Sequence, residues 1–124
     1  TTNAGATSAG FGTGLVFRGE TGTATSYDFD MVRISGMWTT ATHASRSAAM
    51  IFETVDNAGS LTERARISAV GGFQLATATK PTCDSTTRGT QFYVAGGAGV
   101  ADTMEVCAKS TTDLYAWYPM ATIP

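Results

Sequence analysis

The chain has 124 residues, 15% of them charged, with a formal net charge of −2 and few leucines or isoleucines. This balance excludes the basic footprint of a nucleic-acid-binding protein, and no apolar run is long enough for membrane insertion. The wealth of Gly, Thr, Ala and aromatic residues, without helical periodicity, predicts an all-β fold of short antiparallel strands. Because large apolar residues are scarce, we expect the chain to complete its core as a homo-oligomer.

The first part of the chain predicts a β-rich module. Residues 1–9 are small and polar and indicate a linker or an entering strand, and a start at Thr1 rather than Met indicates a processed product or a fragment. Residues 10–78 are expected to form a module of β-sandwich or β-prism type. The apolar side changes parity between Met31 and Val32, which indicates either a bulge there or a strand buried on both sides. The expected strands are 10–19, 27–38, 47–55, 61–71 and 73–76.

The run 61–71 has the clearest period of two. One parity is mostly apolar and is expected to face the interior of an assembly, whereas the other parity carries Arg64 and Arg66. The residues expected on the interior side are Leu61, Glu63, Ala65, Ile67 and Ala69. Glu63 is the charged exception, so we expect it to meet an arginine from a neighbouring strand or another chain.

Two carboxylates lie two residues apart, at Asp28 and Asp30, and therefore share one face of an expected strand. Paired carboxylates serve glycoside hydrolysis in some enzymes, but pairing with arginine or solvation is the commoner role on a strand face. We expect these two residues to form register-fixing or inter-chain ion pairs with Arg33, Arg64 and Arg66.

Residues 79–124 differ in texture and predict a small C-terminal β-meander after a hinge at 77–81. Its expected strands are 89–95, 102–109 and 114–118, the last of them stopped by Pro119. Cys83 and Cys107 are expected to form a disulfide, and the alternative is two free buried thiols.

The aromatic residues near the C-terminus are candidate glycan contacts, at Tyr115, Trp117 and Tyr118. The alternative, that Trp117 fills the core, is common in thin β-proteins. His43 lies in a polar loop and is expected to be solvated, so the sequence predicts no catalytic residue, no metal site and no cofactor.

Several blocks of the sequence resemble segments of bacteriophage tail-fibre and tail-spike proteins. The blocks are Gly12-Thr-Gly-Leu-Val-Phe-Arg-Gly19, Val32-Arg-Ile-Ser-Gly-Met-Trp38, and the run from Ile51 to Gly72 with Glu63-Arg-Ala-Arg-Ile67 at its centre. Residues 82–118 resemble a second module, found at the C-termini of phage and environmental structural proteins. It is matched by Cys83, Arg88-Gly89, Phe92-Tyr-Val94, residues 96–102, Val106-Cys107, Lys109 and Tyr115-Ala-Trp117.

The resemblance implies a non-enzymatic structural component of a virion appendage, a homotrimeric β-fibre on the virion surface or otherwise extracellular. It implies contacts with other virion proteins and with a host-surface glycan or protein receptor. It also gives Gly10, Gly12 and Gly14 a role in close approach between chains. The alternative functions are a carbohydrate-binding module, a capsid decoration protein and an extracellular filament subunit, with a glycosidase the least favoured.

Overall fold

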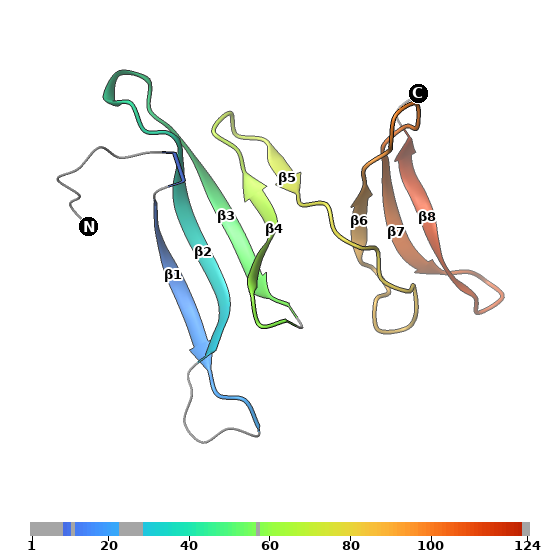
Figure 1. Ribbon diagram of the computed structural model, residues 1–124. Coiled ribbons are helices and arrows are strands. Elements are labelled where there is room, and N and C mark those ends of the chain that lie inside the picture. Colours follow the sequence, from blue (N-terminus) through green and yellow to red (C-terminus); the bar gives the residue numbers. More distant parts are fainter. Residues whose placement is uncertain (1–8, 11, 23–28, 57, 123–124) are drawn as a thin grey trace. The chain divides into compact units, whose positions relative to one another are not determined.

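The computed structural model describes residues 9–10, 12–22, 29–56 and 58–122, and the chain divides after Ala76 into two compact units (Figure 1). The strands of the first unit are β1 (Gly12–Gly19), β2 (Phe29–Thr40), β3 (Ser47–Val55), β4 (Leu61–Ile67) and β5 (Phe73–Leu75). A single 3₁₀ turn, η1 (His43–Ser45), joins β2 to β3. The predicted all-β fold with antiparallel strands is confirmed.

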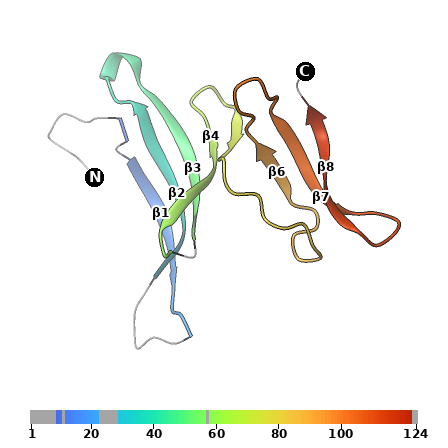
Figure 2. The same ribbon diagram turned by 45° about the vertical axis from the view of Figure 1, so that its right-hand side comes forward.

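The first unit is a meander in which each strand pairs antiparallel with the next, in the order β1-β2-β3-β4-β5. The strands lie in one layer, and β1 to β4 stay side by side when the view is turned (Figure 2). Among the described residues of this unit, buried side chains are confined to Ala49, Ile51, Glu53 and Ala65. A sandwich or prism would therefore need a layer that this sheet does not supply.

A bulge in β2 lies where the sequence indicates either a bulge or a strand buried on both sides, and the register shows that the bulge is the correct alternative. Phe17 pairs with Val32 whereas the next residue, Arg18, pairs with Asp30, so Met31 is the extra residue of β2. Because a bulge adds one residue to one strand, the alternation of β2 changes side at this point. This bulge is the reason why the apolar residues of the sequence change parity at this point.

A second bulge, in β4, overturns the face assignment made from the sequence. Phe52 pairs with Ala65 whereas Glu53 pairs with Glu63, so Arg64 is the extra residue. The bulge puts Leu61 and Glu63 on the face of the sheet opposite to Ala65. The five residues of the predicted interior side therefore do not share a face, and the strand ends at Ile67 rather than at residue 71.

The glycines of β1 serve close packing within the chain. A Cβ atom on Gly12 would collide with the carbonyl oxygen of Gly36, and one on Gly14 would lie 2.8 Å from the carbonyl oxygen of Ile34. Both neighbours belong to β2, so the bare stretch is required by its own sheet. Close packing within one chain therefore explains these two glycines, whereas the resemblance suggested a close approach between chains.

The second unit is a three-stranded meander in the order β6-β7-β8. Its strands are β6 (Gln91–Val94), β7 (Thr103–Lys109) and β8 (Tyr115–Thr122). The predicted stop at Pro119 is wrong, because β8 continues to Thr122. Pro119 pairs with Glu105 on an edge strand beside a shift in register, where the missing N–H is tolerated.

Candidate functional site

One face of the first sheet carries a row of charged side chains across β2, β3 and β4. Arg33 donates two hydrogen bonds to Glu53, from Nε to Oε2 over 2.5 Å and from the second guanidinium nitrogen to Oε1 over 2.7 Å. Glu53 is only 8% exposed, and its hydrogen bond is the main cause that raises the pKa of Arg33. A bidentate pair of this kind aligns two strands more strictly than one contact between point charges does.

The row continues on β4, where Arg66 donates two hydrogen bonds of 2.6 Å to the carboxylate of Glu63. This hydrogen bond is also what raises the pKa of Arg66. Glu63 pairs directly with Glu53 across the strands, so the row reads Arg33, Glu53, Glu63, Arg66. Each of the two neighbouring carboxylates thus has its own arginine. We define these four residues as the charged row and the surface that bears them as the charged face.

Glu63 meets an arginine as expected, but on its own strand rather than on a neighbouring strand or chain. The bulge at Arg64 is the reason, because it brings residues three apart onto the same face. Arg64 itself donates a 2.8 Å hydrogen bond to the hydroxyl of Thr54. Asp30 accepts from Arg18 over 2.7 Å rather than from one of the three expected arginines. Asp28, the other carboxylate of that prediction, lies outside the described residues.

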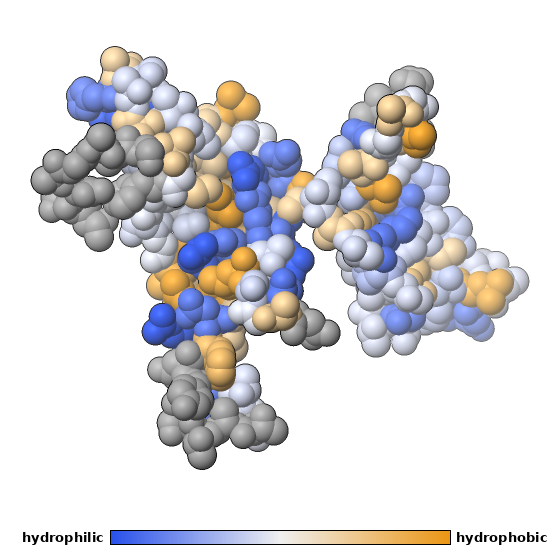
Figure 3. Space-filling view, in the orientation of Figure 1, coloured by the Kyte–Doolittle hydropathy of each residue, from blue (hydrophilic) through white to orange (hydrophobic). Residues whose placement is uncertain are grey.

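The opposite surface of the first sheet is apolar across all five strands. Directly paired residues of an antiparallel ladder point to the same side, so the register assigns the members of this surface. Its larger apolar members are Leu15, Phe17, Val32, Ile34, Trp38, Met50, Phe52, Ala65, Ile67, Phe73 and Leu75, and Thr13, Gly36, Ala48, Thr54 and Thr62 lie on the same side. We call this surface the apolar face. Arg64, the extra residue of the bulge, reaches this side through its hydrogen bond to Thr54. In Figure 3, hydrophobic residues in orange and hydrophilic residues in blue lie close together on the first unit.

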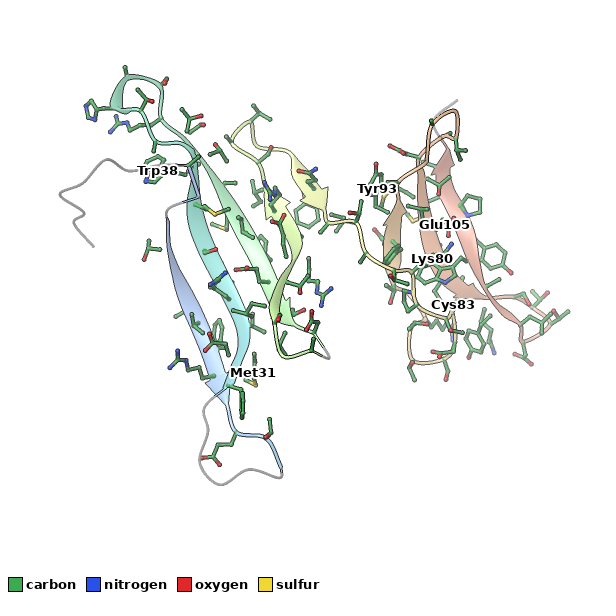
Figure 4. All side chains as sticks on the ribbon, viewed as in Figure 1. Met31, Trp38, Lys80, Cys83, Tyr93 and Glu105 are labelled. Carbon is green, nitrogen blue, oxygen red and sulfur yellow. A yellow bond between two sulfur atoms is a disulfide. The ribbon has the colours of Figure 1, made fainter. Side chains whose placement is uncertain are left out.

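The second unit is held by a disulfide between Cys83 and Cys107, with the Cα atoms 5.4 Å apart. It ties the segment before β6 to the middle of β7, where Cys107 is fully buried. Figure 4 shows Lys80, Cys83 and Glu105 on the same part of this unit. The Nζ of Lys80 and the Oε2 of Glu105 are 2.5 Å apart. The disulfide and this ion pair anchor the segment that precedes β6 on one face of the small sheet.

Trp117 lies under that segment. Its indole Nε1 donates a 3.0 Å hydrogen bond to the carbonyl oxygen of Pro81, and Lys80 Nζ is 5.6 Å from the centre of the ring. Phe92 packs against it edge-on, with the ring centres 5.9 Å apart. Trp117 pairs directly with Cys107, so the indole and the disulfide occupy the same face. Trp117 therefore fills the small core of this unit, which was the alternative to its role as a glycan contact.

The three candidate glycan contacts do not form one platform. Tyr115 and Trp117 share the face of Cys107, whereas Tyr118 pairs with Val106 and points to the opposite face. Tyr118 is 41% exposed and is the most accessible of the three. Because neighbouring residues of a strand alternate in direction, Trp117 and Tyr118 cannot stack on the same sugar ring.

The loop between β6 and β7 is fastened by a contact that sequence reasoning missed. The hydroxyl of Tyr93 donates a 2.6 Å hydrogen bond to Asp102, whose other oxygen accepts from the backbone N–H of Gly96. The hydrogen bond from Tyr93 is the first cause that lowers the pKa of Asp102, and the same bond raises the pKa of Tyr93. In the sequence, only the glycines between Tyr93 and Asp102 indicate this loop, and no local pattern predicts the hydrogen bond that closes it.

Other potential sites carry less chemistry. A hollow of about 160 Å³ on the first unit is lined by Gly12, Gly14 and Gly36 together with Arg33 and Met37. Arg33 is already engaged by Glu53. Within the described ranges, no three His, Cys, Asp or Glu side chains gather in a way that suits a metal ion. No helix in the described part of the chain has the length and apolar character needed to cross a bilayer.

Comparison with known proteins does not add an assignment. No family model, no curated protein and no solved structure matches the chain. The surfaces described above are therefore interpreted from their own geometry and chemistry.

Proposed function

We propose that the chain is a non-enzymatic structural component of a virion appendage, a segment of a phage tail fibre or spike that works as a homotrimer. The resemblance of the Glu63–Ile67 block and of residues 82–118 to such proteins supports this proposal. Its place would be the virion surface, in contact with other virion proteins and with a host receptor.

The observation that carries the proposal is the single-layer sheet of the first unit. A stable domain buries an apolar face against a second layer, and this unit has few buried side chains among its described residues. Small β-domains of this kind gain the missing layer by oligomerisation. An elongated appendage built from repeated copies meets that requirement directly.

Two further features fit this role. The disulfide Cys83–Cys107 is typical of proteins that work in an oxidising, extracellular setting. The carboxylates of the charged row each accept hydrogen bonds from an arginine, which suits strand alignment rather than proton transfer. An assembly role without catalysis explains both features.

Electron microscopy of virus particles that contain the chain tests this function. Antibody raised against the purified chain should label the tail fibres or spikes and leave the capsid shell unlabelled. Label spread over the capsid would favour a decoration protein, and label on cellular filaments without particles would favour a filament subunit. Either pattern would contradict the proposed appendage.

A further inference from the structure

We infer that the apolar face of the first sheet is covered by the same face of other copies of this chain, while the charged face remains in solvent. This inference rests on the proposed homo-oligomer and specifies the surface that builds it. The sequence alone suggested a different interior, one that included Leu61 and Glu63. The bulge at Arg64 removes both residues from the apolar face.

The chemistry of the two faces decides which of them is buried. The paired positions of the apolar face carry no carboxylate and no lysine, and the guanidinium of Arg64 on that side is held by the hydroxyl of Thr54. Copies of this surface can therefore meet around a shared axis without burying a carboxylate. Covering the opposite face would remove the remaining water from the charged row, and the desolvation penalty of buried ion pairs can exceed their mutual attraction.

The exposed area of the apolar face is more than half of what one partner buries in a specific interface. Its most exposed residues are Leu15, Phe17, Met50, Ile67 and Phe73, at 59, 46, 47, 39 and 66%. With roughly 200 Å² for a large apolar residue, these side chains leave about 500 Å² open to solvent. The half-buried members add to this area, and a specific interface takes about 800 Å² per partner. An uncovered patch of this size lies in the upper part of the range of about 300–600 Å² that the largest apolar patch of a typical monomer covers, and such a patch often marks an interaction surface.

The second unit of the same chain is a weaker candidate for this cover. Its sheet has three strands against five, and one face of that sheet is already crossed by the segment that bears Lys80 and Cys83. At about 4.8 Å between strands, three strands span roughly three-fifths of the width of five. A copy of the first unit covers the whole width, so we assign the cover to other copies.

Matched substitutions on the two edge strands test the assignment by the mass in solution. Leu15→Glu and Phe73→Glu place a carboxylate on the apolar face, whereas Val16→Glu and Gln74→Glu place it one residue away on the charged face. We expect the first pair to raise the dissociation constant of the oligomer at least about a hundredfold. The second pair should leave the mass unchanged, and circular dichroism should show β-structure in all four variants.

Oxidation of methionine in the unmutated protein gives a second test that does not depend on the folding of a variant. Met50 lies on the apolar face and is 47% exposed in one chain, whereas Met37 lies on the charged face and is less exposed. Dilute hydrogen peroxide should therefore oxidise Met50 first if the apolar face is open. We expect peptide mass spectrometry to show the reverse order, with Met37 oxidised first.

The outcomes separate this inference from the proposed function. An oligomer that survives Leu15→Glu and Phe73→Glu, or that dissociates equally with Val16→Glu, overturns the face assignment but leaves the homo-oligomer standing. A monomeric wild-type protein overturns both. A monomer in which Met50 is still protected shows that the second unit covers the face, which also contradicts the inference.

Discussion

The guanidinium of Arg33 on β2 and the carboxylate of Glu53 on β3 are joined by two hydrogen bonds, of 2.5 and 2.7 Å. This pair lies at the start of the charged row and fixes the register of the central strands. A slip of one residue would carry Glu53 to the apolar face. The pair thus links strand alignment to the separation of the two faces.

Removing one partner of this pair should destabilise the protein clearly. We expect Glu53→Ala to lower the free energy of unfolding by about 1–3 kcal/mol, because it leaves the Arg33 guanidinium without its acceptor in a partly buried place. Urea unfolding at a fixed chain concentration measures the loss, and a double-mutant cycle with Arg33→Ala isolates the coupling. The exposed pair of Arg18 and Asp30 is the control, with a coupling of about 0–1 kcal/mol. Equal coupling in the two cycles would contradict the role given to Glu53.

The disulfide should stabilise the second unit selectively. Replacing both Cys83 and Cys107 by alanine is expected to cost about 3 kcal/mol, because the closed loop restricts the unfolded chain. Hydrogen exchange checks the location of the effect. Amides of β6, β7 and β8 should exchange faster in the double variant, while those of β2 and β3 keep their rates. Uniform acceleration in both units would show that the disulfide does not act locally.

Trp117 should behave as a core residue. We expect Trp117→Phe to cost about 1 kcal/mol through the lost hydrogen bond to Pro81, and Trp117→Ala to cost about 3 kcal/mol. The thermal unfolding midpoints of the two variants show which substitution costs more stability. Tyr118→Ala, on the other face of the same strand, should change the midpoint less than Trp117→Ala does. If the two alanine variants unfold alike, Trp117 does not fill the core of this unit.

Stability should fall in acid because three turn aspartates have lowered pKa values. The main causes are the backbone N–H of Ser60 at Asp56, the hydroxyl of Thr86 at Asp84 and the hydroxyl of Tyr93 at Asp102. A folded pKa below the unfolded value of about 3.9 means that this stabilisation is complete above that pH. It is lost as the pH falls through the folded values. Urea midpoints measured from neutral pH to about pH 2 should decline below pH 4, and less steeply in Asp84→Asn. A flat profile would contradict these hydrogen bonds.

The sequence was sufficient to predict which segments form strands, because alternation and glycine-containing turns are local signals. It misplaced the ends of β4 and β8. It was not sufficient to predict the faces. The bulge at Arg64 depends on which residue of β3 stands opposite, so its effect on Glu63 has no local signature, whereas the bulge at Met31 leaves one in the apolar pattern. The extension of β8 past Pro119 depends likewise on the place of that strand at a sheet edge.

The candidate site was predicted in part for the same reason. The charged residues of the row were visible in the sequence except Glu53, whose burial beside Arg33 follows from the pairing of β2 with β3. The three aromatic candidates do not form one glycan-stacking platform, because strand alternation places Trp117 and Tyr118 on opposite faces. The contact between Tyr93 and Asp102 closes a loop between neighbouring strands, which composition does not reveal.

The mass of the unmutated protein in solution tests the central claim most directly. Light scattering coupled to size-exclusion chromatography should give three times the 12.9 kDa of one chain, and the mass should fall only on dilution or in denaturant. A mass of 12.9 kDa at the highest concentration measured would contradict the homotrimer and the role of the apolar face.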